Sequence, residues 1–421
     1  MLDCRTPDGR NTMKQNQELA SISRLGLAVI VTLYLAHALP LYFYNVALPA
    51  ILRSQGVELR WIGMLSLLYL PWACKFLWAP LTERYYLPAL GRRRTWLWLT
   101  QIALVAGVLA LAFTGLDYGL LPFVLIGLWI STFAATQDIA IDGYTVESLS
   151  PADHRLGSMA QSMGVALGSM VGGAGMLLIY QLYGWYSALL SLAILSALTL
   201  LAVSQVNDSS PASLKSERPS FIRTFKRREM LWALLLILLY RLVEAPAMAM
   251  ITPLLVDQQW SLTQIGLLMS VAGAGVGLLA AITTAKALKR YCAETLLIQA
   301  GWLRSGVYLL IAALFYSGMI NASGLWLGLL VIVMLAVRYM AMTSLYALFM
   351  RLCSRQQAGT DFTVLVCVEL LVFFLGGSFS GFLAAGLGYG AYYLLLGVIS
   401  LLSILLCRPI IRKHLANATQ P

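Results

Sequence analysis

The sequence predicts an all-α membrane protein, and three observations carry this prediction. Of the 421 residues, 60% are hydrophobic and only 11% are charged, whereas soluble domains carry about 25% charged residues. Twelve apolar stretches are long enough to cross a bilayer as helices, which takes about 20 residues each. Basic residues are concentrated in alternate loops between these stretches. The composition therefore excludes a soluble globular protein, a disordered chain and a disulfide scaffold.

The twelve predicted transmembrane helices divide into two halves of six. A polar stretch at 206–229, rich in Ser, Pro and basic residues, is predicted to be a cytoplasmic linker between the half at 25–205 and the half at 230–410. The tails at 1–24 and 411–421 are polar, and the first 24 residues have no apolar core of the kind that marks a cleavable signal peptide. The spans are 25–50, 61–81, 95–116, 119–146, 157–181, 184–205, 230–256, 264–285, 294–318, 322–350, 361–386 and 388–410. The shortest turns between them lie near Asp117, Gly184, Ser323 and Gly388.

The net charge of +11 is explained by the orientation of the chain. The tails and the loops on one side hold 23 of the 29 Lys and Arg, whereas the opposite loops hold only Arg53 and Arg60, and four more lie within spans. Because cytoplasmic loops are enriched in Lys and Arg, both termini are predicted to lie in the cytoplasm. The charge forms no single patch, so no nucleic-acid partner is expected.

The loop after the second span carries charges that could act as a gate. Glu83 and Arg84 are followed by Arg92, Arg93 and Arg94. Charge-assisted hydrogen bonds between these residues could latch neighbouring helix ends in one conformation and release them in another. Alternatively, the arginines serve only to orient the chain in the membrane.

Two carboxylates lie within the fourth span. Asp138 and Asp142 are four residues apart, so they share one face of a helix. A charge near the middle of a bilayer costs about 2.5–3.5 kcal/mol, and two neighbouring carboxylates oppose each other's ionisation. The pair is therefore a candidate for proton coupling. In the alternative, both lie at the cytoplasmic end of the helix and bind loop arginines such as Arg92–Arg94 or Arg155.

Other charges inside spans must find a partner or line a wet cavity. Arg241 and Glu244 are three residues apart and opposite in sign, so they could neutralise each other. Glu369 is a further proton-coupling candidate, and Arg304 could snorkel to the membrane surface. We expect five of these residues to face a central cavity, although a static ion pair is the alternative for each: Lys75, Arg241, Glu244, Arg338 and Glu369.

Polar and aromatic residues on the first span form one helical stripe, which includes Tyr34, His37, Tyr44 and Asn45. Together with Gln137, they are candidates for a substrate cavity that could hold a flat aromatic ligand. His37 is the only His within a predicted span, and an unperturbed imidazole titrates near pH 6.5, so it is also a proton-coupling candidate. Packing between helices is the alternative for the whole stripe.

Glycines recur at every fourth position in the fifth and eleventh spans. The fifth span has Gly164, Gly168 and Gly172, and the eleventh has Gly377 and Gly381. Small residues at this spacing let helix backbones approach closely. We therefore expect a structural role for these glycines, and their recurrence supports an internal repeat of the two halves.

Three segments identify a family resemblance: Lys75-Phe-Leu-Trp-Ala-Pro80, Ala134-Ala-Thr-Gln-Asp-Ile-Ala-Ile-Asp-Gly-Tyr144 and Ala358-Gly-Thr-Asp-Phe-Thr363. With the loop signature around Glu83, the chain resembles the major facilitator superfamily, its AmpG-like branch, and within that branch the RhtX/FptX group of siderophore permeases. Asp361 stands where members of the branch usually have Gln. The resemblance implies a fold of two six-helix halves with a substrate site between them, in the bacterial inner membrane.

The same resemblance implies the function. A secondary transporter, driven by protons as a symporter, would import a siderophore or metal-siderophore complex of the yersiniabactin type. The chain has no GxxxxGK[ST], HExxH or GxSxG motif, so neither an enzyme, a cofactor nor a bound metal is expected. Two alternatives remain open: a permease for a muropeptide or CoA ester, and an accessory protein of a siderophore ABC importer that transports nothing itself. A monomer surrounded by lipid is expected.

Overall fold

The computed structural model describes residues 23–55, 68–115, 120–206, 220–319, 324–354 and 356–415, and these residues form helices and their connections. The prediction of an all-helical protein is confirmed. Most of each tail, most of the linker and the first part of the predicted span at 61–81 fall outside the described residues.

The first half of the chain consists of the following elements: α2 (Arg24–Tyr42), η1 (Phe43–Ala47), α3 (Leu48–Ser54), α5 (Leu70–Cys74), η3 (Lys75–Leu77), α6 (Ala79–Arg84), α7 (Arg92–Thr114), α8 (Leu120–Ser148), α9 (His154–Gly168), η4 (Ser169–Gly175), α10 (Met176–Leu198) and α11 (Leu200–Ser204). The second half consists of α12 (Phe221–Lys226), α13 (Arg228–Arg241), α14 (Glu244–Ala249), α15 (Ile251–Asp257), α16 (Leu262–Gly266), η6 (Leu267–Ala272), α17 (Gly273–Ala287), α18 (Ala293–Tyr316), α19 (Gly324–Leu352), α20 (Ala358–Ile410) and η8 (Ile411–Leu415).

Ten helical stretches among the described residues are long and apolar enough to cross a membrane. One of them, His154–Ser204, contains two of the predicted spans. Gly184 breaks that stretch with a φ of 81°, and Gly388 breaks α20 with a φ of 72°. Because glycine adopts positive φ at little steric cost, these breaks lie at two of the turns that the sequence predicts. The count of twelve spans stays a prediction.

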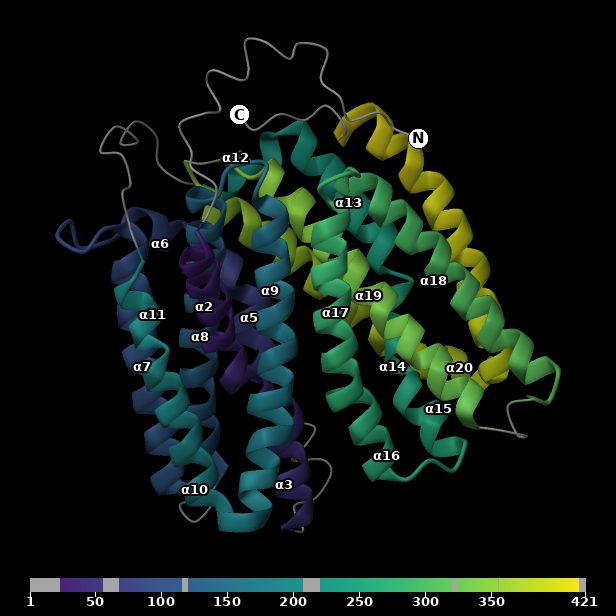
Figure 1. The fold of residues 1–421 in the computed structure, drawn as a ribbon, viewed down its shortest axis with the longest axis horizontal. Coiled ribbons are helices and arrows are strands. Elements are labelled where there is room, and N and C mark those ends of the chain that lie inside the picture. The colour runs from purple at the N-terminus through teal and green to yellow at the C-terminus, as the bar shows by residue number, and fades with distance from the viewer. Residues whose placement is uncertain are drawn as a thin grey trace.

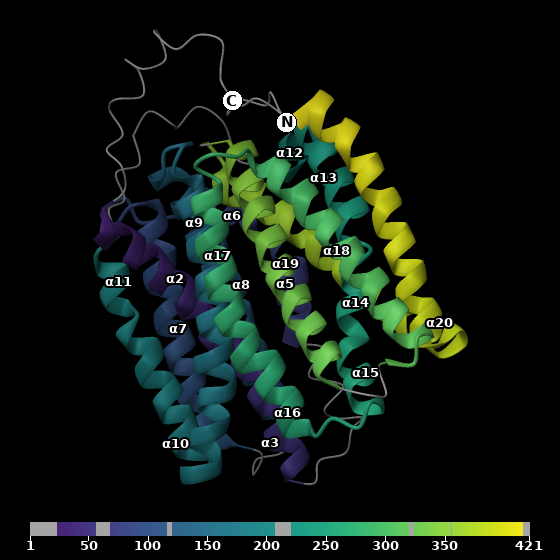
Figure 2. The same cartoon turned by 45° about the vertical axis from the view of Figure 1, so that its right-hand side comes forward.

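The two halves form two groups of helices that lie side by side. In Figure 1, α2 to α11 form the purple, blue and teal group, and α13 to α20 form the green and yellow group. Helix α9 lies beside α17 in both views, and it also contacts α19 (Figure 2). The elements α6 and α12 lie at the upper end, and α3 and α16 lie at the opposite end. We call the first of these the α12 end.

Close packing of α9 and η4 against α2 depends on three of the predicted glycines. A methyl group at Gly164, Gly168 or Gly172 would collide with Tyr34, Ala38 or Leu39, respectively. The corresponding contact in the second half differs from the prediction. A methyl group at Gly377 would touch only Ala249, at 3.9 Å, and at Gly381 no described atom lies within 4 Å. The close approach lies instead at Gly376, where Ala245 and Pro246 are each 3.1 Å away.

Candidate functional site

A lysine and a histidine bind Asp138 inside the first half, where η3 and α8 also contact α20 of the second half. Lys75 Nζ forms an ion pair with Asp138 Oδ2, and His37 Nε2 lies 3.3 Å from Oδ1. The ring of Trp72 lies beside both bases, 5.3 Å from Lys75 Nζ and 5.5 Å from the imidazole. All three charged or titratable side chains are buried. A buried carboxylate needs such partners because low polarity makes an isolated charge very costly.

The local sequence explains how Lys75 reaches this position. The short helices α5 and α6 each have a proline in their first turn, where its missing N–H is tolerated. Between them the chain tightens into the 3₁₀ turn η3, which begins at Lys75. This broken segment carries the lysine into the bundle, where it faces the unbroken helix α8.

Asp142 lies one turn after Asp138, but it forms no ion pair with any residue that the structure describes. Its Oδ1 accepts hydrogen bonds from the Tyr34 hydroxyl at 2.9 Å and from Gln161 Nε2 at 3.4 Å. Its Oδ2 has no hydrogen-bond partner among the described residues. Of the loop arginines, Arg155 lies 3.6 Å from Asp153, and Arg92 and Arg93 pair with Glu83 and Glu147. The structure therefore places both carboxylates among partners inside the bundle.

Five charged residues meet at the centre of the second half. Arg241 ends α13 and donates to Glu244 Oε1 at 2.5 Å, and its other terminal nitrogen lies 2.6 Å from Glu369 Oε1. Arg338 Nε lies 3.4 Å from Glu244 Oε1. Arg304 does not snorkel to the surface. It donates to Ser400 and to the Tyr240 carbonyl and lies 3.9 Å from Glu244. All three arginines thus lie within 4 Å of Glu244, and Arg241 also pairs with Glu369. The Arg338 side chain is 32% exposed.

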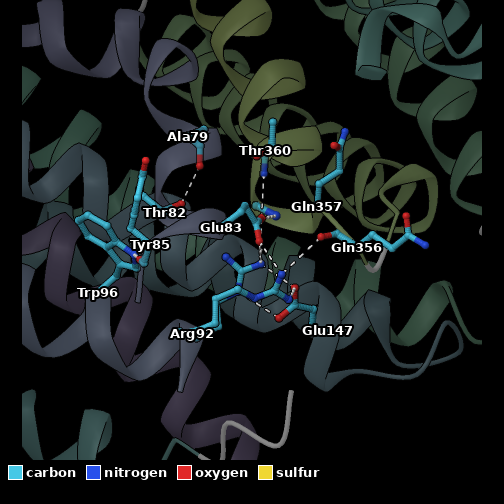
Figure 3. Close-up of polar contacts among 12 residues, drawn as sticks. Ala79, Thr82, Glu83, Tyr85, Arg92, Trp96, Glu147, Gln356, Gln357 and Thr360 are labelled. Atoms are coloured by element: carbon cyan, nitrogen blue, oxygen red, sulfur yellow. Dashed lines mark hydrogen bonds and ion pairs between the residues drawn. The ribbon is translucent and has the colours of Figure 1, made fainter. Parts of the chain in front are cut away.

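Three of the five predicted gate residues, Glu83, Arg92 and Arg93, join the two halves at the α12 end. Glu83 Oε2 lies 2.9 Å from both Arg92 and Arg93, and Glu147 binds the same two arginines (Figure 3). Glu83 Oε1 also accepts hydrogen bonds from the backbone N–H groups of Gly359 at 2.8 Å and Thr360 at 3.3 Å. Free N–H groups and a partial positive charge at a helix N-terminus favour such a carboxylate. Glu83 therefore bridges α6 to the first turn of α20.

The remaining predicted residues lie elsewhere. Arg84 is exposed and lies over the Tyr85 ring at 5.2 Å, whereas Arg94 is half-buried on α7. Gln137 donates to Gln101 on α7, so it points into its own half. Tyr44 is buried against Phe43. The prediction for Asn45 concerns a side chain outside the described part of the structure.

Several partners were missed by the sequence reasoning. Gln161 could have been found as a polar residue in an apolar span, three residues before Gly164. Trp72 and Phe373 carry no comparable signal, because an aromatic residue in an apolar stretch most often packs in the core. Phe373 lies 5.7 Å from the guanidinium carbons of both Arg241 and Arg338.

Asp361 anchors the end of the linker. Its Oδ1 accepts from Thr224 at 2.6 Å and from Gln357 at 2.7 Å, and its Oδ2 accepts from Arg227 at 2.9 Å. Arg227 also donates to the Leu352 carbonyl at 2.8 Å. Asp361 therefore fastens α12 to the start of α20.

Apolar helices in two groups, charged clusters buried at the centre of each and an ionic bridge at one end define a membrane transporter. The chain belongs to the Major Facilitator Superfamily, whose model matches residues 30–372. It is 28% identical over 406 residues to the anhydromuropeptide permease of Escherichia coli K12, covering 90% of this chain and 79% of the permease. It is 25% identical over 374 residues to an uncharacterised protein of Haemophilus influenzae, covering 84% and 87%.

Solved structures show the same fold. A bacterial homologue of the iron transporter ferroportin, in an outward-facing state, matches with a TM-score of 0.69 and 15% identity, over 93% of this chain and 99% of that one. The proton:xylose symporter XylE matches with a TM-score of 0.69 and 13% identity, over 93% and 98%. The protein is therefore a multi-pass membrane transporter with bacterial relatives of the AmpG type.

Proposed function

We propose that this protein is a proton-driven importer of a bulky organic solute in the bacterial inner membrane, with twelve spans and both termini in the cytoplasm. The linker and tails would then lie on the cytoplasmic side, which corresponds to the α12 end. The excess of Lys and Arg in the tails and loops of one side supports this orientation.

One observation carries the proton coupling. Two carboxylates lie within one turn of a buried helix, but within the described part of the chain only Asp138 forms an ion pair with a basic side chain. An ionised Asp142 would be a buried charge without a counter-ion, which is strongly unfavourable. Its two donors, Tyr34 and Gln161, both reach Oδ1, which leaves Oδ2 as a place for a proton. We assign the transported proton to Asp142 and the positioning of that site to Asp138, Lys75 and His37.

The gate supports alternating access. With Glu83 bonded across the halves, the α12 end is closed in this conformation. A transporter must break these contacts to release solute on that side. Asp142, the proposed proton site, and Glu147, which pairs with the gate arginines Arg92 and Arg93, lie on the same helix α8. Movement of α8 would therefore affect both the proton site and the gate.

Two solutes compete for the role of substrate. The motif resemblance favours a siderophore or a metal-siderophore complex, such as a yersiniabactin-like chelate. The identity with the anhydromuropeptide permease across 90% of this chain favours a muropeptide. We propose the siderophore first, on the motif resemblance, and the muropeptide second. Both are bulky organic solutes, and one assay separates them.

The test uses purified protein in proteoliposomes with an imposed proton gradient directed inward. Labelled siderophore, its ferric complex and labelled anhydromuropeptide are offered in separate reactions. We expect accumulation of one class, loss of driven accumulation in Asp142→Asn, and normal accumulation in Asp257→Asn, whose exposed carboxylate bonds Tyr389. If none of the three accumulates in correctly oriented vesicles, the transport proposal is wrong and the accessory role gains support.

A further inference from the structure

The second half holds a charged cluster that the proton site does not use. We propose that Arg338 binds a carboxylate on the transported solute and that the ring of Phe373 packs against a flat portion of that solute. This inference rests on the proposed transport function, and it narrows the substrate class to organic anions with a planar apolar part.

Arg338 differs from the other cations of the cluster in exposure. Its side chain is 32% exposed, whereas those of Arg241 and Arg304 are 7% and 3% exposed. Arg241 binds two glutamates, and Arg304 binds backbone and hydroxyl oxygens. These two arginines are held in the protein interior, while the Arg338 side chain stays partly exposed.

The bonding of Arg338 leaves its outer edge available. Its Nε lies 3.4 Å from Glu244, whereas its two terminal nitrogens make no hydrogen bond or ion pair to any residue that the structure describes. A guanidinium edge with two parallel N–H groups matches the two oxygens of a carboxylate. Glu244 thus fixes the orientation of the guanidinium and leaves the paired donors for a ligand.

The surroundings of Arg338 are aromatic. The Phe373 ring lies 5.7 Å from its guanidinium carbon, and the next residue on α19 is the half-buried Tyr339. Further along α19, the Thr343 hydroxyl lies 2.9 Å from the Ser162 hydroxyl of α9, in the other half. Arg338 therefore lies near the boundary between the halves, where a solute would be held during alternating access.

Charge balance gives the same answer. Three arginines and two glutamates leave the second-half cluster with one excess positive charge when all are ionised, and one carboxylate would cancel it. In the first half, two aspartates and Lys75 leave one excess negative charge while His37 is neutral, and one proton would cancel that. The loaded protein would then move with both buried clusters neutral, which lowers the cost of passing through an occluded state.

The test compares 2-naphthoate with its uncharged amide, 2-naphthamide, as probes for purified full-length protein. Binding is measured as the concentration-dependent rise in the unfolding temperature. We expect the naphthoate to stabilise the wild type more than the amide. Arg338→Gln should weaken naphthoate binding by about 10- to 100-fold, since hydrogen bonds to charged groups contribute on that scale. Arg338→Lys should lose less, because it keeps the charge without the fork.

The matched control is Arg351→Gln. Arg351 lies on the same helix with a side chain that is 28% exposed, but it pairs with Glu294 near the end of α19. Arg351→Gln removes the same net charge as Arg338→Gln and should leave naphthoate binding unchanged. The inference is overturned if naphthoate and amide stabilise the wild type equally, if neither binds, or if Arg338→Gln binds naphthoate normally. These outcomes are independent of vesicle uptake, so a failure of the transport proposal is seen separately.

Discussion

Glu83 in the first half accepts a hydrogen bond of 2.8 Å from the backbone N–H of Gly359, which opens the first turn of α20 in the second half. The same carboxylate neutralises Arg92 and Arg93. A single side chain thus satisfies a helix terminus in one half and two cations in the other. Its removal should loosen the α12 end specifically.

We expect Glu83→Gln to favour conformations that are open at the α12 end. Charge-assisted hydrogen bonds contribute about 1.5–3 kcal/mol each, so the ratio of closed to open conformations should fall by about tenfold or more. Cys353 is fully buried near this end, and its rate of maleimide labelling, followed by mass spectrometry, should rise by a similar factor.

Glu147→Gln is the control for the gate. Glu147 binds the same two arginines as Glu83, but no bond from its side chain to α20 exists among the described residues. The rate at which Cys353 is labelled in Glu147→Gln should stay near that of the wild type. Equal acceleration in both variants would show that the arginine cluster, and not the bridge to α20, closes this end.

A second prediction concerns the contact between α9 and α2. Gly168→Ala would place a methyl group against Ala38 Cβ, with the Ala38 carbonyl carbon only 3.1 Å away. Overpacking of this kind costs about 1–3 kcal/mol, so the unfolding temperature in detergent should fall by several degrees. In Gly306→Ala, on α18, no described atom lies within 4 Å of the new methyl group, and the unfolding temperature should not fall. A comparable fall in both variants would refute the steric explanation.

The anchor at Asp361 gives a third prediction. In Asp361→Asn the ion pair with Arg227 is lost, and α12 should detach more often from the start of α20. Trypsin cleavage after Arg223 and Lys226 should then be several times faster than in the wild type. Asp153→Asn, in the turn before α9, changes one carboxylate far from α12 in sequence and should leave the cleavage rate unchanged. An unchanged rate in Asp361→Asn would mean that packing alone holds this helix.

Local patterns in the sequence predicted what depends on neighbours along the chain. The helices follow from apolar runs, the breaks at Gly184 and Gly388 from turn residues, and the Arg241–Glu244 pair from a spacing of three. The partners of Lys75 and Glu369 could not be read in this way. Asp138 lies 63 residues beyond Lys75, and Arg241 contacts Glu369 only after α13 and α20 have packed. Gly381 shows the limit of a repeat, because the expected spacing is present but no described atom comes close.

The ion pair of Lys75 and Asp138 provides the last prediction. Lys75→Met would leave Asp138 buried with only His37 beside it. Removing one partner of a buried pair costs about 3–5 kcal/mol, whereas replacing both is far less harmful. The double variant Lys75→Met, Asp138→Asn should therefore be more stable than Lys75→Met alone when thermal unfolding is compared at neutral pH.

The same double variant separates stability from transport. If Asp142 carries the proton, the rescued protein should keep some proton-driven uptake, since Asp142, Tyr34 and Gln161 are unchanged. Asp142→Asn should lose driven uptake while remaining as stable as the wild type, because it removes a carboxylate that no cation binds. Additive destabilisation in the double variant would contradict the pairing, and normal driven uptake in Asp142→Asn would exclude Asp142 as the proton carrier.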